Sequence, residues 1–390
     1  MDKNLELLQS EIFKLPKERD ESYFPLFLGK MFDKYLEKAG QFTGKIGEGI
    51  KENRSKSIKL IESLKRSLNY YYQGYPSKAF LEFKNGVDGI TDLLWKQKRD
   101  ILVAGSRENL FRVRKKSKGG NVHSKADMFH VPFQDRFKIS TQRYSIPGFP
   151  CLYLGNSVYT CCVELGINKT EDLEEMSVVR VDASKYKFLE MSMSPSWILR
   201  GFEGSFKRDG TSELFDDFVI YLISVWPLIA ACSTKVMRPP DEKLITSHFF
   251  KPEYIFPQML LEWVRMSEDL DGIKYFSSHN NLMEAEYDEL INYAIPVKID
   301  CPNGQCPQLI HDLPITDPIS YKSIVENNPS ITNIEYSNGA GDSDKKGEYR
   351  LLGGLRFLKI KDKRVWYIDT IYGKLEFELL KNMTPSQIIQ

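Results

Sequence analysis

Apolar residues recur at steps of three and four along the first hundred positions of the chain. The segments "NLELLQSEIFKL", "YFPLFLGKMFDKYLEKAG" and "SIKLIESLKRSLNYYYQG" all follow this spacing, which places apolar side chains on one face of a helix. Gly74 and Pro76 separate two further helical segments, because these residue types interrupt regular structure. We therefore expect residues 1–105 to form an α-helical N-terminal region.

The pattern changes at about residue 107, where apolar and polar residues begin to alternate. In "ENLFRVRKKS", Phe111 and Val113 alternate with Arg112 and Arg114, which predicts a short strand. The segment "SVYTCCVELG" predicts a helix ending at Gly166. Further strands are predicted at "PCLYLGNS", "SVVRVDAS", "YKFLEMS" and "DGIKYF".

Longer apolar patterns follow in the second half of the chain. Residues 213–232 and 252–266 predict helices. The tail, residues 355–380, alternates like a terminal hairpin with the bend at "YGK". Together these elements predict an α+β fold, with the N-terminal region followed by a second domain over residues 106–390.

Charge is balanced overall but not locally. The chain has 54 Lys and Arg against 53 Asp and Glu, a net charge of +1, so no global attraction to nucleic acid or membranes is expected. Between residues 107 and 143, however, ten Lys and Arg stand against three acids. Within this region Arg112 and Arg143 lie in apolar, strand-like sequence, where an arginine is costly without an anionic partner.

The sequence gives no indication of export or membrane insertion. The apolar run at 214–233 contains Asp216, Asp217 and Pro227, so we interpret it as a buried helix. The first 21 residues are charged throughout and do not resemble a signal peptide. We expect a cytoplasmic protein with six reduced cysteines.

Two cysteine pairs invite a chemical interpretation. Cys301 and Cys306 in "CPNGQCPQ" superficially suggest a zinc knuckle, but no second Cys or His pair lies at a suitable spacing. Cys161 and Cys162 lie in an apolar helix without an obvious His partner, which favours buried residues over a nucleophile. We therefore expect no metal site.

An arginine on a strand, Glu164 on a helix and Ser277 after "GIKY" carry the remaining chemistry. Arginines bind pyrophosphate through paired hydrogen bonds, and a carboxylate stabilises positive charge on a sugar whose glycosidic bond is breaking. His130 in "MFHVPF" lies in an apolar setting, and both ligand contact and a structural role are open for it.

These motifs resemble the RES-domain family, which is named for its Arg, Glu and Ser. The resemblance extends loosely over residues 107–310 and leaves the first 105 residues and the tail outside. Two positions depart from the common family pattern: Val113 follows the first arginine instead of an aromatic residue, and Tyr144 stands where Trp is commoner. The matching positions are Arg112, Arg143, Tyr144, Gly148, Tyr153, Leu154, Ser157, Glu164 and Ser277, with Ser278 as an alternative to Ser277.

The resemblance implies an ADP-ribosyltransferase-like fold with a split β-structure that binds NAD. It also implies an NAD phosphorylase or glycohydrolase that acts as a toxin and requires no cofactor, with phosphate as a possible co-substrate. In this reading Arg112, Glu164 and Ser277 are catalytic. The residues expected to bind NAD are Arg112, Arg143, Tyr144, Tyr153, Ser277, Ser278 and His130.

Two alternatives remain open at the level of the sequence. The same fold supports ADP-ribose transfer onto a macromolecule, which the local cationic region allows. An inactive module that binds NAD or a protein partner is the other. For every reading the expected partners are NAD and an antitoxin or regulatory protein, with a homo-oligomer possible and neither membrane nor nucleic acid expected.

Overall fold

A computed structural model shows two compact units. The first comprises Met1–Gly105, Gln142–Tyr144 and Met191–Trp263, and the second comprises the three remaining segments of the chain. The first unit thus contains the predicted N-terminal region together with later segments that the sequence placed in the following domain. The structure describes residues 3–21, 23–94, 109–115, 122–167, 176–195, 198–199, 212–237, 250–278, 290–322, 357–360 and 363–381.

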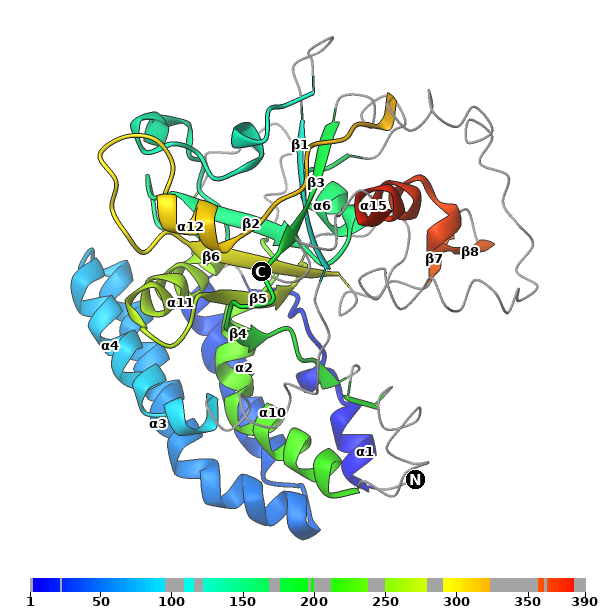
Figure 1. Ribbon diagram of the computed structural model, residues 1–390. Coiled ribbons are helices and arrows are strands. Elements are labelled where there is room, and N and C mark those ends of the chain that lie inside the picture. The colour runs from blue at the N-terminus through cyan, green and yellow to red at the C-terminus, as the bar shows by residue number, and fades with distance from the viewer. Residues whose placement is uncertain are drawn as a thin grey trace. The chain divides into compact units, whose positions relative to one another are not determined.

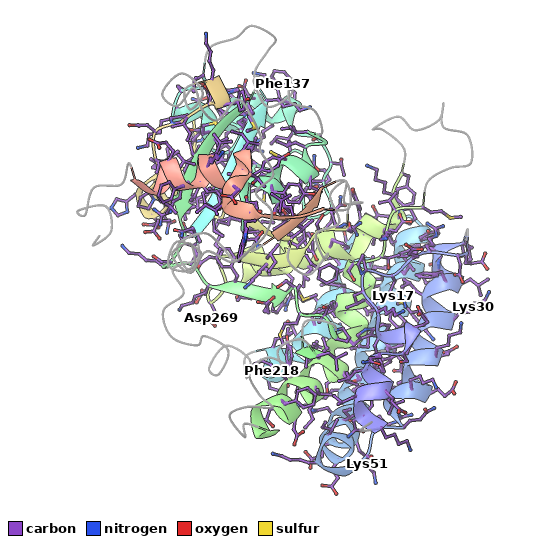
Figure 2. All side chains as sticks on the ribbon, turned by 90° about the vertical axis from the view of Figure 1, so that its right-hand side faces the viewer. Lys17, Lys30, Lys51, Phe137, Phe218 and Asp269 are labelled. Carbon is purple, nitrogen blue, oxygen red and sulfur yellow. The ribbon has the colours of Figure 1, made fainter. Side chains whose placement is uncertain are left out.

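Helices build the first unit, as the three- and four-residue spacing predicts (Figure 1). The polar residues of α2 and α3 lie on the outer faces of the helices. Figure 2 shows the side chains of Lys30 and Lys51 pointing away from the ribbon. The opposite faces are apolar and buried, which is the usual source of stability for a helix of this kind. The described elements are α1 (Lys3–Leu8), η1 (Glu11–Phe13), α2 (Phe24–Ala39), α3 (Gly44–Tyr72), α4 (Pro76–Asp88), α10 (Ser212–Cys232), η6 (Pro252–Tyr254) and α11 (Ile255–Met266).

Helix α10 is the core helix of this unit. The ring of Trp226 stacks on Tyr35 with centroids 5.1 Å apart, and the Tyr35 hydroxyl donates to the carbonyl of Ile223 over 2.7 Å. Among the described residues, Phe215–Cys232 is the one helical stretch long and apolar enough to cross a membrane, and 78% of it is buried inside the structure. The sequence interpretation of a buried core helix is confirmed.

A six-stranded sheet forms the second unit. The strand order is β3-β1-β2-β6-β5-β4, and the β1–β3, β1–β2, β2–β6 and β5–β6 pairings are antiparallel. The α+β class is therefore confirmed. The strands are β1 (Asn109–Lys115), β2 (Cys151–Gly155), β3 (Met176–Asp182), β4 (Phe188–Met191), β5 (Gly272–Phe276) and β6 (Ile291–Pro296).

Both faces of this sheet are covered. Alternate residues of β1 go to opposite sides, since Leu110 belongs to one buried cluster and Phe111 to another. The Phe111 cluster includes α6 (Val158–Glu164) and α15 (Ile371–Lys381), which lie near each other in Figure 1. The other cluster includes η2 (Ala126–Met128), η3 (Phe133–Lys138) and α12 (Pro307–Asp312).

The tail differs from the sequence prediction. A hairpin forms, but its strands are β7 (Phe357–Ile360) and β8 (Lys363–Trp366), and "YGK" lies inside α15 after η9 (Tyr367–Asp369). The prediction of a bend at "YGK" is therefore wrong. Gly373 is needed for close packing instead, because a Cβ atom there would lie 2.3 Å from the Tyr367 carbonyl oxygen.

Candidate active site

The register of the central strands gathers polar side chains on one face of the sheet. Tyr153 pairs with Ala294 and Gly155 with Asn292, and Tyr275 on β5 pairs with Asn292 as well. Directly paired residues point to the same side of a sheet. Tyr153, Asn292 and Tyr275 therefore share the face on which α6 packs.

Glu164 is brought to this face by α6. The helix begins directly after β2, with the Ser157 side chain capping it by accepting the Thr160 N–H over 2.9 Å. It ends at Glu164, and Gly166 behind it has a φ of +63°, a left-handed conformation that suits glycine. The predicted helix and its terminating glycine are confirmed.

The Glu164 carboxylate accepts two side-chain hydrogen bonds at one oxygen. The Ser277 hydroxyl donates to Oε1 over 2.6 Å, and the Asn292 amide donates to the same atom over 2.7 Å. Ser277 and Asn292 are 1% and 4% exposed, whereas Glu164 is half-buried. Charge-assisted bonds of this kind fix the orientation of a carboxylate.

The contact distinguishes the two serines considered from the sequence. Ser277 extends the β5–β6 pairing, since its N–H donates to the Leu290 carbonyl over 2.7 Å, and its hydroxyl reaches Glu164. Ser278 follows it and is half-buried. Asn292 was missed by the sequence analysis, although an amide near the start of the otherwise apolar strand "INYAIP" was a usable signal.

Arg112 lies where β1 and β2 separate. The two strands share a single register pair, Phe111 with Gly155. Beyond it the Arg112 guanidinium donates to the Tyr153 carbonyl over 2.8 Å and to the Phe129 carbonyl over 3.4 Å. Its Nε atom is buried without a hydrogen-bond partner, and burial lowers the pKa of Arg112 to about 10. This arginine thus carries a buried positive charge held by carbonyl oxygens.

Tyr153 lies next to this cation. The phenol is half-buried, and burial raises its pKa well above the ordinary value, with smaller contributions from Cys151 and Tyr275. The side chain is therefore neutral across the physiological range. A half-buried neutral ring on the sheet face is suited to stacking against a flat ligand.

Arg143 and Tyr144 lie in the other unit. The Arg143 guanidinium donates to the carbonyls of Cys232 and Thr234 over 3.3 and 2.9 Å, at the end of α10. It also lies over the Tyr254 ring at 5.1 Å, and Tyr144 is buried. The structure thus assigns Arg143 to the support of a helix end, in a compact unit separate from the one that contains Glu164.

His130 has both ring nitrogens engaged by the protein. Its Nδ1 lies 2.8 Å from the Val131 carbonyl, which accepts from it, and its Nε2 accepts the Cys306 N–H over 2.9 Å. Burial lowers the pKa of His130, so the ring is neutral. The structural role is the one that these contacts support, and they leave no ring nitrogen for a ligand.

The buried thiols of Cys151 and Cys161 show no sign of activation. Burial raises the pKa of Cys151 and of Cys161 to about 12, which keeps the thiols protonated. Cys161 donates to the Phe111 carbonyl over 3.2 Å. Across the described ranges, no group of three or more His, Cys, Asp and Glu side chains is arranged to hold a metal ion.

The sequence of this chain is similar to that of a known protein. The chain is 33% identical over 328 residues to the Bacillus subtilis (strain 168) protein named "Putative toxin YopC". The matched region covers 80% of this chain and 69% of YopC. The chain belongs to the YopC family. No protein-family model matches the YopC-like chain, and no solved structure matches it.

Proposed function

We propose that this YopC-family chain is a toxin that degrades NAD by cleaving the bond between nicotinamide and ribose. The observation that carries the proposal is the convergence of Ser277 and Asn292 on the Glu164 carboxylate. The three side chains come from the residue directly after β5, from β6 and from α6, and the sequence resemblance to RES domains names two of them. The toxin name of the relative supports the biological side of the proposal.

The chemistry suits a carboxylate without a metal ion. A phosphate or water oxygen attacks the anomeric carbon of the nicotinamide ribose, and the C–N bond breaks with its electron pair moving to the pyridinium nitrogen. Nicotinamide leaves as a neutral molecule, and ADP-ribose 1″-phosphate, or ADP-ribose and a proton, remains. Glu164 stabilises the positive charge that develops on the ribose.

Two further residues of the second unit supply binding. Arg112 uses two of its N–H groups on carbonyls, and its remaining donors bind the pyrophosphate or the attacking phosphate. Tyr153 stacks on the nicotinamide ring. Ser277 and Asn292 hold Glu164 in the orientation that faces the ribose.

Nicotinamide release from NAD tests the proposal. The purified full chain is incubated with NAD, with and without phosphate, beside Glu164→Gln and the control Glu268→Gln, which changes an exposed carboxylate of the same unit. We expect wild type and Glu268→Gln to release nicotinamide at similar rates and Glu164→Gln to be about 100-fold slower or worse. Intact NAD with wild-type protein would refute the proposal.

The products separate the related activities. ADP-ribose 1″-phosphate identifies phosphate as the acceptor, and ADP-ribose identifies water. Transfer of label from the adenine half of NAD to a macromolecule would replace the proposal with ADP-ribosyl transfer. Tight NAD binding without turnover would leave a binding module instead. An antitoxin partner, proposed from the toxin relationship, is tested by rescue of growth on co-expression.

A further inference from the structure

The N-terminal end of α6 is held by residues far along the chain. A helix begins with N–H groups that have no partner within the helix. In α6 the Val158 N–H donates to Oε1 of Glu376 over 2.6 Å, and the Tyr159 N–H donates to the Tyr367 hydroxyl over 3.4 Å. The Thr160 N–H is taken by the Ser157 cap.

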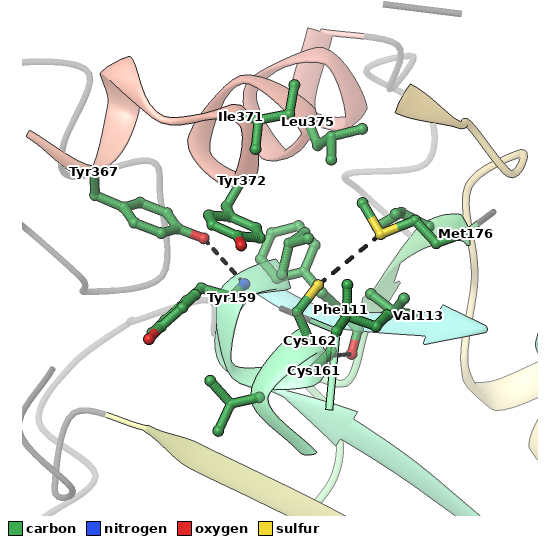
Figure 3. Close-up of a cluster of buried hydrophobic side chains, with 14 of the residues drawn as sticks. Phe111, Val113, Tyr159, Cys161, Cys162, Met176, Tyr367, Ile371, Tyr372 and Leu375 are labelled. Atoms are coloured by element: carbon green, nitrogen blue, oxygen red, sulfur yellow. Dashed lines mark hydrogen bonds between the residues drawn. The ribbon is translucent and has the colours of Figure 1, made fainter. Parts of the chain in front are cut away.

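The two tail residues also bond to each other. The Tyr367 hydroxyl donates to the same Oε1 atom of Glu376, so one short network joins η9, α15 and the first turn of α6. Figure 3 shows the Tyr367 hydroxyl directed at the backbone nitrogen of Tyr159, with side chains of α15 above the helix. We call Glu376, Tyr367 and the two N–H groups they accept the α6 clamp.

Apolar packing surrounds the α6 clamp. The ring of Tyr372 meets Tyr159 edge to face with centroids 5.2 Å apart. Leu375 and Leu379 belong to the same buried cluster as Val158. Glu376 itself is fully buried, and a carboxyl group buried in an apolar cluster is costly unless it is hydrogen-bonded and neutral.

We propose that Glu376 is a positioning residue that fixes α6 and thereby holds Glu164 against Ser277 and Asn292. The helix has seven residues, so its clamped start and its functional end are less than two turns apart. A shift at Val158 is transmitted directly to Glu164. This assigns the C-terminal tail a function in the site, and its catalytic consequence rests on the proposed function.

The environment of Glu376 makes the α6 clamp sensitive to pH. Burial raises the pKa of Glu376 to about 8, while its bonds to Tyr367 and Val158 act in the opposite direction. The titratable groups that face it are Tyr367 of η9 and the Cys161 and Cys162 thiols of α6, all with pKa values raised by burial. Lys115 on β1 acts on Cys162. The neutral carboxyl therefore fits the site, and its ionisation favours opening.

Hydrogen exchange of the full chain tests the α6 clamp without reference to activity. Glu376→Gln keeps an acceptor oxygen for Val158, whereas Glu376→Met keeps the volume and removes the acceptor. We expect peptides covering Val158–Glu164 to exchange about 10-fold faster in Glu376→Met and within about 2-fold of wild type in Glu376→Gln. Glu378→Met, the same change two residues along α15, is the matched control and leaves α6 unchanged.

Two results would overturn the inference. One is α6 protection in Glu376→Met equal to wild type; the other is faster exchange that extends equally to β6, which indicates global destabilisation. If Glu376→Met does not fold, the pH series decides. We expect the opening of α6, measured by hydrogen exchange and corrected for the chemical exchange rate, to rise from pH 6.5 to 8.5 in wild type and to stay constant in Glu376→Gln. The same pH dependence in both proteins would refute the role of Glu376.

NAD turnover adds the catalytic readout. We expect Glu376→Met to lower kcat about 10-fold with little change in KM, and Glu376→Gln to restore kcat. A wild-type protein that does not turn over NAD refutes the proposed function and leaves the exchange data to decide on the α6 clamp. A kcat that falls equally in Glu376→Gln and Glu376→Met would exclude the hydrogen bond as the positioning contact.

Discussion

A glutamate oxygen accepts two described hydrogen bonds at each end of α6, yet the surroundings differ: Glu164 is the last residue of the helix, and Glu376 of α15 contacts its start. Glu164 meets the polar side chains of Ser277 and Asn292 and is half-buried. Glu376 meets a backbone N–H and a phenol and is fully buried in an apolar cluster. Each of these two oxygens thus accepts two described hydrogen bonds, and burial distinguishes the two groups.

In the proposed mechanism this difference separates the reacting end of α6 from its supported end within seven residues. A carboxylate that reaches the surface can meet a ligand and respond to its charge. A carboxyl group enclosed by Tyr367, Tyr372 and Leu375 cannot meet a ligand, and its bonds order the backbone instead. The predictions below alter one end of α6 at a time and ask whether the effect stays at that end.

Replacement of Glu164 gives the largest expected effect. For the proposed cleavage of NAD, Glu164→Gln removes the charge assigned to stabilising the ribose cation, so we expect kcat/KM for NAD to fall about 100- to 10,000-fold. Stability changes by less than about 1 kcal/mol, because the side chain is half-buried and the amide keeps an acceptor oxygen. Turnover and urea unfolding of the same samples measure both. A large loss of stability with unchanged turnover would reverse the roles assigned to the two ends.

The pH dependence of stability reports on the other end. Burial raises the pKa of Glu376 from its ordinary 4.5 to about 8, so the folded state holds a proton that the unfolded chain releases. Stability from this group is fully present below pH 4.5 and is lost as pH rises towards 8, with a slope of up to about 1.4 kcal/mol per pH unit.

The range between pH 7 and 8 separates the contribution of Glu376 from that of His130. The pKa of His130 is lowered from 6.5 by burial, so its contribution is lost as pH falls and is constant above about pH 7. Urea unfolding between pH 7 and 8 should therefore show wild type losing about 1 kcal/mol and Glu376→Gln almost nothing. Parallel curves for the two proteins would show that Glu376 is not the titrating group.

Sequence reasoning located one end of this helix and missed the other. Glu164 could be singled out because a carboxylate in the apolar segment "TCCVELG" stands out and resembles the glutamate of the RES-domain pattern. Glu376 in "KLEFELL" has the spacing of an ordinary surface charge on an amphipathic helix. Its burial depends on contact with α6, some two hundred residues earlier, which no local pattern contains.

The helices and strands themselves were more predictable than the contacts between them. Strands β1 and β2, helix α6 and helix α10 follow the local periodicity, and Gly166 marks a helix end. Gly373 misled, because a glycine that permits close packing has the same sequence signature as one that permits a turn. The pairing that brings Asn292 to Glu164 is long-range and required coordinates.

Tyr367→Phe tests the second contact of the α6 clamp. The change removes one hydroxyl and leaves the Tyr159 N–H and part of the Glu376 carboxyl without a partner. A buried group left unsatisfied costs about 1–3 kcal/mol, so we expect unfolding by urea at pH 7 to show a loss in that range. Tyr372→Phe, in the same buried cluster, is the control for the loss of a tyrosine hydroxyl group. Equal losses in both variants would contradict a specific role for Tyr367.

The smallest effect concerns Ser277 and Ser278, the two serines that follow β5. Ser277→Ala removes one of the two donors to Glu164 while Asn292 keeps the other, so we expect kcat/KM to fall about 10-fold, the value of one hydrogen bond to a charged group. Ser278→Ala should lower it less, because in the structure it is Ser277 that reaches the carboxylate. NAD turnover of both variants beside Glu268→Gln makes the comparison. A larger loss in Ser278→Ala than in Ser277→Ala would contradict the assignment of Ser277 as the serine on which the orientation of Glu164 depends.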